Sequence, residues 1–215
     1  MQPAEDAVQR EFKYLVLNYL QKEADEVSAN AYASCTKIYF DKDYFLRLIV
    51  TDQVEKADEL LTRYVDIKNE SELLALLEVK KFLLFRCVLE NNLIQIRTIV
   101  DSLKLIEGGN NIHVRMLLTK LFLDVNPFTD EAFQPYLTHD IFRKTVLGPR
   151  VLLYLEKSPN FQNIMTLPPM QDNILKKLVS NGVRYDHIKI CSGKPSDKIE
   201  ILSLLEQKHS CDGKK

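Results

Sequence analysis

The segment ESELLALLEVKKFLLFRCVLENN, at residues 70–92, constrains the fold of this chain more than any other. Its apolar residues recur at helical spacing, and they cover most of the helix circumference instead of one stripe. A helix that is apolar on nearly every side is stable in water only when other elements surround it. We therefore expect a central helix near residues 71–90, with the rest of the chain packed around it.

The flanking sequence supplies such neighbours. Phe12, Leu15, Val16, Tyr19 and Leu20 recur at three and four residues and give a first helix with an apolar face. The same pattern predicts further helices near residues 28–36, 41–50, 54–65, 92–105, 112–124, 129–136, 138–144, 147–157 and 171–181, with a last one after Ser196. We expect Gly182 to cap the helix before it.

The predicted fold class is all-α, a compact multi-helix bundle with one core. No alternating strand pattern of convincing length and no fixed-period repeat occurs in the sequence. The first glycines, Gly108 and Gly109, precede two asparagines and form a break between a front and a back half.

Charge and composition exclude several classes of protein. The 29 basic and 30 acidic side chains give a net charge of -1, which argues against direct nucleic-acid binding. No apolar run approaches the roughly 18 residues of a membrane span. The N-terminus begins with acids, which argues against a secretory signal. The four cysteines are therefore expected to be reduced thiols or metal ligands.

No arrangement of residues predicts catalysis, so we expect a protein that is not an enzyme. Cys35 and Cys87 lie within apolar helical stretches, where cysteine usually behaves as a small hydrophobe. His113 and His139 stand at predicted helix starts without a nucleophile or paired carboxylate at helical spacing. Walker, Rossmann and nucleophile-elbow patterns are absent from the sequence.

The C-terminal residues contain a possible zinc site. Two close pairs, His187-x3-Cys191 and His209-x-Cys211, offer the four ligands that a tetrahedral structural zinc requires. Four protein ligands leave no open position for catalysis, and binding would stabilise a tail that packs poorly by itself. The alternative is a solvated tail whose histidines and cysteines are incidental.

Several segments, taken in order, resemble a known family. Leu15 to Tyr32 resembles the LisH motif, carried by Leu15, Leu17, Tyr19, Leu20, Ala29 and Tyr32. KIYFDKDYFLRLIVTDQVEKADELL and LLEVKKFLL resemble a CTLH motif. VLLYLEKSPNF and LPPMQDNILKKLVSNGVRYDH resemble the last core helices, of the CRA type. Together they are similar to the N-terminal domain of plant Topless-type corepressors over residues 11–211.

The resemblance implies one integrated domain made of four segments. These are LisH-like dimerisation helices at 11–36, CTLH-like helices at 37–106, CRA-like helices at 107–186 and a zinc-binding tail at 187–211. Topless-type domains are similar in the tail as well, with a His and a Cys after the last core helix and a His-Ser-Cys farther on.

The resemblance also implies a function, that of an oligomeric adaptor with a corepressor-like role in transcriptional or chromatin silencing. Such a protein binds short leucine-rich peptides of the LxLxL kind in a groove, and it works in the nucleus, with the cytoplasm as the alternative. The groove positions fall at Leu77, Lys81, Ile106 and Tyr154. Ordinary core packing is the alternative for all four. A further groove lysine of the family falls near Leu74 and Ala75, so part of the basic rim is missing.

Self-association is the second implied property. The LisH-like face of Leu15, Val16, Tyr19 and Tyr32 is the expected homodimer interface, and a homotetramer is possible through further helices. The competing hypothesis from another class is a structural subunit of a ubiquitin-ligase or splicing assembly, in which a LisH–CTLH domain serves only for assembly.

Overall fold

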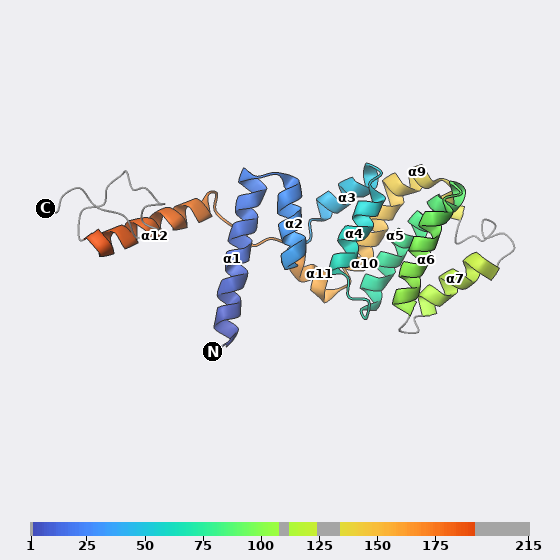
Figure 1. Ribbon diagram of the computed structural model, residues 1–215, viewed down its shortest axis with the longest axis horizontal. Coiled ribbons are helices and arrows are strands. Elements are labelled where there is room, and N and C mark those ends of the chain that lie inside the picture. The colour runs from blue at the N-terminus through green and yellow to red at the C-terminus, as the bar shows by residue number, and fades with distance from the viewer. Residues whose placement is uncertain (1, 108–111, 124–133, 192–215) are drawn as a thin grey trace. The chain divides into compact units, whose positions relative to one another are not determined.

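A computed structural model describes residues 2–107, 112–123 and 134–191, and all regular structure in these ranges is helical (Figure 1). The all-α prediction is thereby confirmed for this part of the chain. The helices fall into two compact units: residues 30–167 form one, and the other contains α1 (Gln2–Glu23) and α12 (Ile174–Cys191). None of the described helices combines the length and the apolar character needed to cross a membrane.

The unit of residues 30–167 is built around α5. Its elements are α3 (Lys42–Val50), α4 (Val54–Tyr64), α5 (Glu70–Leu89), α6 (Leu93–Glu107), α7 (Ile112–Leu123), α8 (Gln134–Leu137), α9 (His139–Phe142), the π-helix η2 (Arg143–Leu147), α10 (Gly148–Leu155) and α11 (Pro159–Ile164). Contacts from α4, α6, α8 and α10 all fall on α5. The central helix predicted from its all-round apolar surface is confirmed.

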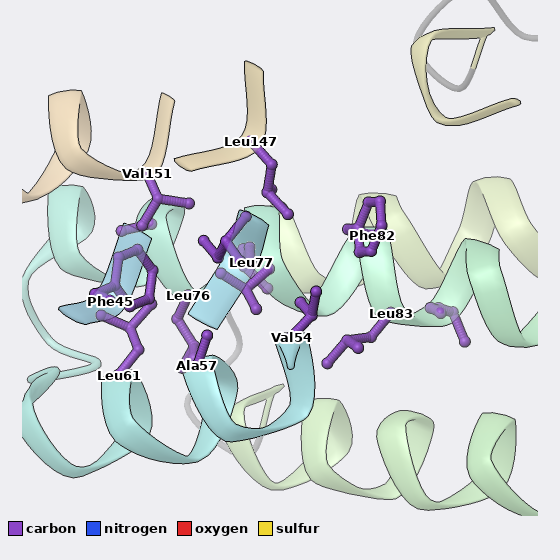
Figure 2. Packing of buried hydrophobic residues seen from close by; sticks show 14 of the residues in the cluster. Phe45, Val54, Ala57, Leu61, Leu76, Leu77, Phe82, Leu83, Leu147 and Val151 are labelled. Carbon is purple, nitrogen blue, oxygen red and sulfur yellow. The ribbon is translucent and has the colours of Figure 1, made fainter. Parts of the chain in front are cut away.

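The core of this unit lies on both sides of α5. Figure 2 shows Val54, Ala57 and Leu61 of α4 on one side and Leu147 and Val151 on the other, with α5 side chains between them. Full burial of a Leu or Phe side chain stabilises a fold by about 1.5–3 kcal/mol. Most of the fold's stability therefore rests on the residues that cover α5.

An aromatic cluster anchors the segment before α3. The ring centroid of Phe40 lies 5.6 Å from that of Phe45 and 5.2 Å from those of Tyr64 and Phe161. The Phe40 amide donates to the Ile164 carbonyl at 2.8 Å, which ties this segment to α11. Edge-to-face rings at such distances stabilise by about 0.5–1.5 kcal/mol beyond burial.

Helix α11 was not predicted, although its start signal stands in the sequence. Ser158 caps the helix by accepting from the Asn160 amide at 3.2 Å, and Pro159 occupies the first helical position. This Ser-Pro combination is a standard helix start. Ser158 is also completely buried, and it donates to the buried carboxylate of Glu72 at 2.5 Å.

Two other details differ from the predicted helices. The expected end at Gly182 is wrong, because α12 continues through it to Cys191. One glycine costs a helix only about 1 kcal/mol relative to alanine, and the apolar spacing continues on both sides of it. The π-helix η2 between α9 and α10 was not predicted from the sequence. Residues 129–133 and the helix expected after Ser196 lie outside the described residues.

The unit that contains α1 and α12 is held by polar contacts where the two helices meet. Lys22 pairs with Asp172, and the Nζ of Lys176 lies 2.6 Å from Oε1 of Glu23. The same Lys176 ammonium lies 5.9 Å from the ring centroid of Tyr19. Helix α2 (Glu26–Thr36) crosses the boundary between the two units.

Candidate peptide-binding surface

Leu77 does not reach the surface. Its side chain is 1% exposed and belongs to the core cluster, where Figure 2 shows it among Leu76, Val54 and Leu147. The sequence left two roles open for Leu77, a position in the peptide groove or ordinary core packing. Its burial agrees with core packing. Ile106 belongs to α6, but its side chain lies outside the described residues.

Lys81 and Tyr154 lie on neighbouring helices, α5 and α10, which pack closely against each other. The Nζ of Lys81 lies 2.9 Å from Oε1 of Glu78, and its side chain is 26% exposed. Tyr154 is half-buried against the core, and the ammonium of Lys157 lies 5.5 Å from its ring centroid. Two of the four predicted groove residues therefore have polar atoms or ring surface available to a ligand.

Glu78 organises the polar contacts around Lys81. Its carboxylate is almost completely buried, and besides Lys81 it accepts from the Tyr136 hydroxyl at 3.0 Å and from Nη1 of Arg150 at 3.4 Å. A buried carboxylate is tolerated only with such donors. Burial, together with the negative charge of Glu78, raises the pKa of the Tyr136 hydroxyl, so Tyr136 remains a donor at physiological pH.

Arg150 is a candidate ligand-binding residue that the sequence reasoning missed. Its side chain is 40% exposed, and its guanidinium carbon lies 5.3 Å from the ring centroid of Phe142. Because Arg150 bridges α10 to Glu78 of α5, it places a cation beside Lys81. The only signal was local: Arg150 shares one helical face with Leu153, Tyr154 and Lys157.

These residues form one surface, which we name the α10 surface: Lys81, Arg150, Leu153, Tyr154 and Lys157. Leu153 is 60% exposed and supplies its apolar part. In the part of the chain that the structure describes, Lys157 forms no ion pair, and Glu78 is the one carboxylate that engages Lys81 or Arg150. The α10 surface is therefore apolar at its centre and positively charged at its edge.

The predicted dimerisation residues are divided between the two units. Leu15, Val16 and Tyr19 share one face of α1 with Val8 and Phe12, which we name the α1 face. Phe12 is 58% exposed and Val8 66%, so a large apolar area is uncovered. The opposite side of α1 contains Leu17, which is completely buried.

Tyr32, the fourth predicted dimerisation residue, belongs to the unit of residues 30–167. It is half-buried, and burial raises the pKa of its hydroxyl.

The predicted zinc ligands are only partly described. His187 and Cys191 both lie within α12, four positions apart in the sequence. That spacing suits two ligands of one metal ion. Their side chains, and the whole of His209 and Cys211, lie outside the described residues. Among the residues that are described, no three His, Cys, Asp or Glu side chains converge in a metal-binding group.

Cys87, Cys35 and His113 lie in different environments. Cys87 is buried, its Sγ lies 3.2 Å from Oε1 of Gln95, and burial raises the pKa of the thiol. A raised pKa disfavours the reactive thiolate. Cys35 is exposed on α2, and Nε2 of His113 lies 3.2 Å from a carboxylate oxygen of Glu70.

Comparison with models of known protein families finds no match, and a search of curated proteins finds no relative that matches this chain.

Proposed function

We propose that this chain is a non-enzymatic oligomeric adaptor whose α10 surface binds a short leucine-rich peptide with acidic neighbours. The observation that carries the proposal is the joint anchoring of Lys81 and Arg150 on buried Glu78, beside the exposed Leu153. The anchoring holds two cations in place before a ligand arrives. A preorganised surface loses less entropy on binding than one whose side chains must be ordered.

The apolar centre of the α10 surface suits leucine side chains. Leu153 and the exposed part of the Tyr154 ring lie next to each other on one helical face. Peptides that bind helical domains commonly place alternating or helically spaced apolar side chains on such a surface. The LxLxL pattern implied by the Topless-type resemblance supplies closely spaced leucines.

The charged edge of the α10 surface suits acidic residues next to those leucines. Lys81, Arg150 and Lys157 surround the apolar centre, and an Arg–carboxylate contact is directional as well as electrostatic. Charge complementarity increases the association rate and selects among apolar ligands. In this proposal Arg150 of α10 takes the place of the groove lysine that the Topless-type resemblance implies near Leu74 and Ala75 and that this chain lacks.

The remaining parts of the proposal follow the resemblance. The α1 face supports self-association, because an uncovered apolar face of this size usually marks an interface. An oligomer presents several peptide sites at once, which strengthens binding to repeated motifs.

We propose a corepressor-like role in the nucleus and a structural zinc on His187, Cys191, His209 and Cys211. Zinc content measured in the purified protein, with and without Cys211→Ser, tests the metal site.

A structural assembly subunit is the second candidate. The exposed α1 face favours it, because assembly needs that face and does not need the α10 surface. The two candidates differ in whether changes on α10 affect partner binding.

A peptide-binding titration tests the leading candidate. A fluorescent peptide with an LxLxL core and flanking Asp residues would be titrated with the wild type, Leu153→Glu and the control Ile141→Glu. Ile141 is 67% exposed on α9, so it matches Leu153 in exposure and chemistry. We expect the affinity to fall roughly tenfold or more for Leu153→Glu, the factor that about 1.4 kcal/mol produces, and to be unchanged for the control. Equal binding by all three proteins, or none by the wild type, contradicts the proposal.

A further inference from the structure

Lys81 and Arg150 are separated by one carboxylate group, that of Glu78. Its Oε1 accepts from Lys81 at 2.9 Å, and its Oε2 accepts from Nη1 of Arg150 at 3.4 Å. Glu78 is almost completely buried, so it contacts the two cations from the core side. Both cations keep a surface side, because Lys81 is 26% exposed and Arg150 40%. A second anionic group of similar size can therefore reach both cations from the solvent.

Most N–H donors of these two side chains are still available to a ligand. An ammonium group has three N–H donors and a guanidinium has five. Lys81 uses one of them on Glu78, and Arg150 uses those that reach Glu78 and the Tyr136 hydroxyl. Among the residues that the structure describes, no other acceptor engages Lys81 or Arg150. The pair can thus donate several further hydrogen bonds to one ligand.

The positive charge of this cluster exceeds what one carboxylate of a ligand would neutralise. Lys81, Arg150 and the neighbouring Lys157 supply three positive charges, and Glu78 offsets one of them. Glu156 follows α10 six positions after Arg150, which places it on another face of the helix. A phosphate monoester carries about 1.5–2 negative charges at neutral pH, whereas an aspartate carries one. Phosphate therefore matches the charge of the cluster more closely than aspartate does.

Given the peptide-binding function proposed above, on which this step depends, we infer that the acidic group beside the peptide leucines is a phosphate on a serine or threonine. Leu153 lies one helical turn after Arg150, so one short peptide can contact both residues. The three terminal oxygens of a phosphate can accept from an arginine and a lysine at once, and arginine contacts to phosphate are directional. The α10 surface then distinguishes a phosphorylated leucine-rich peptide from the unphosphorylated one.

Three fluorescent peptides that differ at one position test the phosphate contact. Each contains an LxLxL core followed by serine, aspartate or phosphoserine, and fluorescence anisotropy measures its binding to the wild type, Arg150→Gln, Leu153→Glu and the control Arg97→Gln. Arg97 is 86% exposed on α6, so the control removes the same charge elsewhere. Circular dichroism confirms equal folding. The ratio of the affinities for the phosphoserine and serine peptides isolates the phosphate contact, because a change in fold affects both peptides alike.

We expect the wild type to bind the phosphoserine peptide about tenfold more tightly than the serine peptide, with the aspartate peptide between them. Arg150→Gln should bring the phosphoserine and serine affinities close together, while Arg97→Gln preserves their ratio. Inorganic phosphate added to the serine peptide should not strengthen its binding.

Three results overturn the phosphate site and leave the proposed function standing. They are equal affinities for the phosphoserine and aspartate peptides, a ratio that Arg150→Gln leaves unchanged, and an equal gain from free inorganic phosphate. Two other results overturn the proposed function together with the phosphate site. These are a wild type that binds none of the peptides, and a Leu153→Glu variant that binds all of them as tightly as the wild type.

Discussion

Arg150 of α10 reaches across to the buried carboxylate of Glu78 on α5, with 3.4 Å between its Nη1 and Oε2 of Glu78. The two residues are 72 positions apart in the chain. Their contact couples the core of the larger unit to its surface, because Glu78 is buried while the guanidinium remains partly exposed. The position of the proposed peptide site therefore depends on a core residue.

Glu78→Gln tests that dependence. The amide keeps an acceptor oxygen but loses the charge that holds Lys81, Arg150 and the Tyr136 hydroxyl. We expect the free energy of unfolding to fall by about 1–3 kcal/mol, the cost of disrupting hydrogen bonds to a buried charged group. Urea unfolding followed by circular dichroism measures it. The matched control Glu156→Gln, exposed at the end of α10, should change it by less than about 0.5 kcal/mol. An equal effect of both changes would show that the Glu78 contacts contribute little.

Only part of the α10 surface could be predicted from the sequence, and the reason is physical. Lys81 and Tyr154 became candidates through the Topless-type resemblance, whereas helical spacing identifies only which residues share a face of one helix. It does not specify which faces of two distant helices meet. Arg150 becomes a site residue only because α10 packs on α5, and Leu77 is removed from the surface by the same packing.

Arg143 provides a test of the link between α3 and the π-helix. Its guanidinium is almost completely buried and donates to the carbonyl of Ile49 at 2.7 Å, at the C-terminal end of α3. We expect Arg143→Met to lower the free energy of unfolding by about 2–3 kcal/mol, since charge-assisted hydrogen bonds are lost and carbonyls remain buried.

Lys144→Met is the control, because Lys144 binds the same Asp140 as Arg143 but is half-exposed. Its change should be below about 0.5 kcal/mol. Thermal or urea unfolding that shifts equally for the two variants would contradict the structural role of Arg143.

The acid stability of the fold should depend in part on Asp140. Hydrogen bonds from Lys144 and Arg143 hold the pKa of this carboxyl below its ordinary value of 3.8. A pKa that is lower in the folded than in the unfolded state stabilises the fold above 3.8, and the contribution is lost as the pH falls through the folded-state pKa. We therefore expect Asp140→Asn to lose less stability than the wild type on acidification below about pH 4. Unfolding curves over a pH series test this, and equal slopes would contradict it.

Self-association through the α1 face is tested by Phe12→Glu. A carboxylate at this exposed position would be buried without a partner in any interface formed by the face. Light scattering should show a lower molar mass than for the wild type, with an unchanged circular dichroism spectrum. Gln21→Glu, a similar charge on the opposite side of α1, should leave the mass unchanged. A mass that neither change affects would place the interface elsewhere.

The fold class was predictable because one property dominates it. An apolar surface around all of α5 requires neighbours on every side, and the spacing of the other helices supplies them. The sequence signals for the start or end of a single helix were weaker where two local preferences oppose each other. Ser158 and Pro159 begin a helix too short to show a period, and Gly182 looks like a cap although its flanks continue the helical pattern. The cost of one glycine is smaller than the gain from continuing the helix.

Hydrogen exchange in the presence of a peptide tests the central claim most directly. The wild-type protein would be exchanged with and without a saturating LxLxL peptide flanked by Asp, and backbone protection would be mapped by mass spectrometry. The proposal predicts slower exchange in residues 148–157 and in the part of α5 around Lys81, with the protection lost in Leu153→Glu. Protection confined to other helices, or no protection by a peptide that binds, would contradict the assignment of the α10 surface.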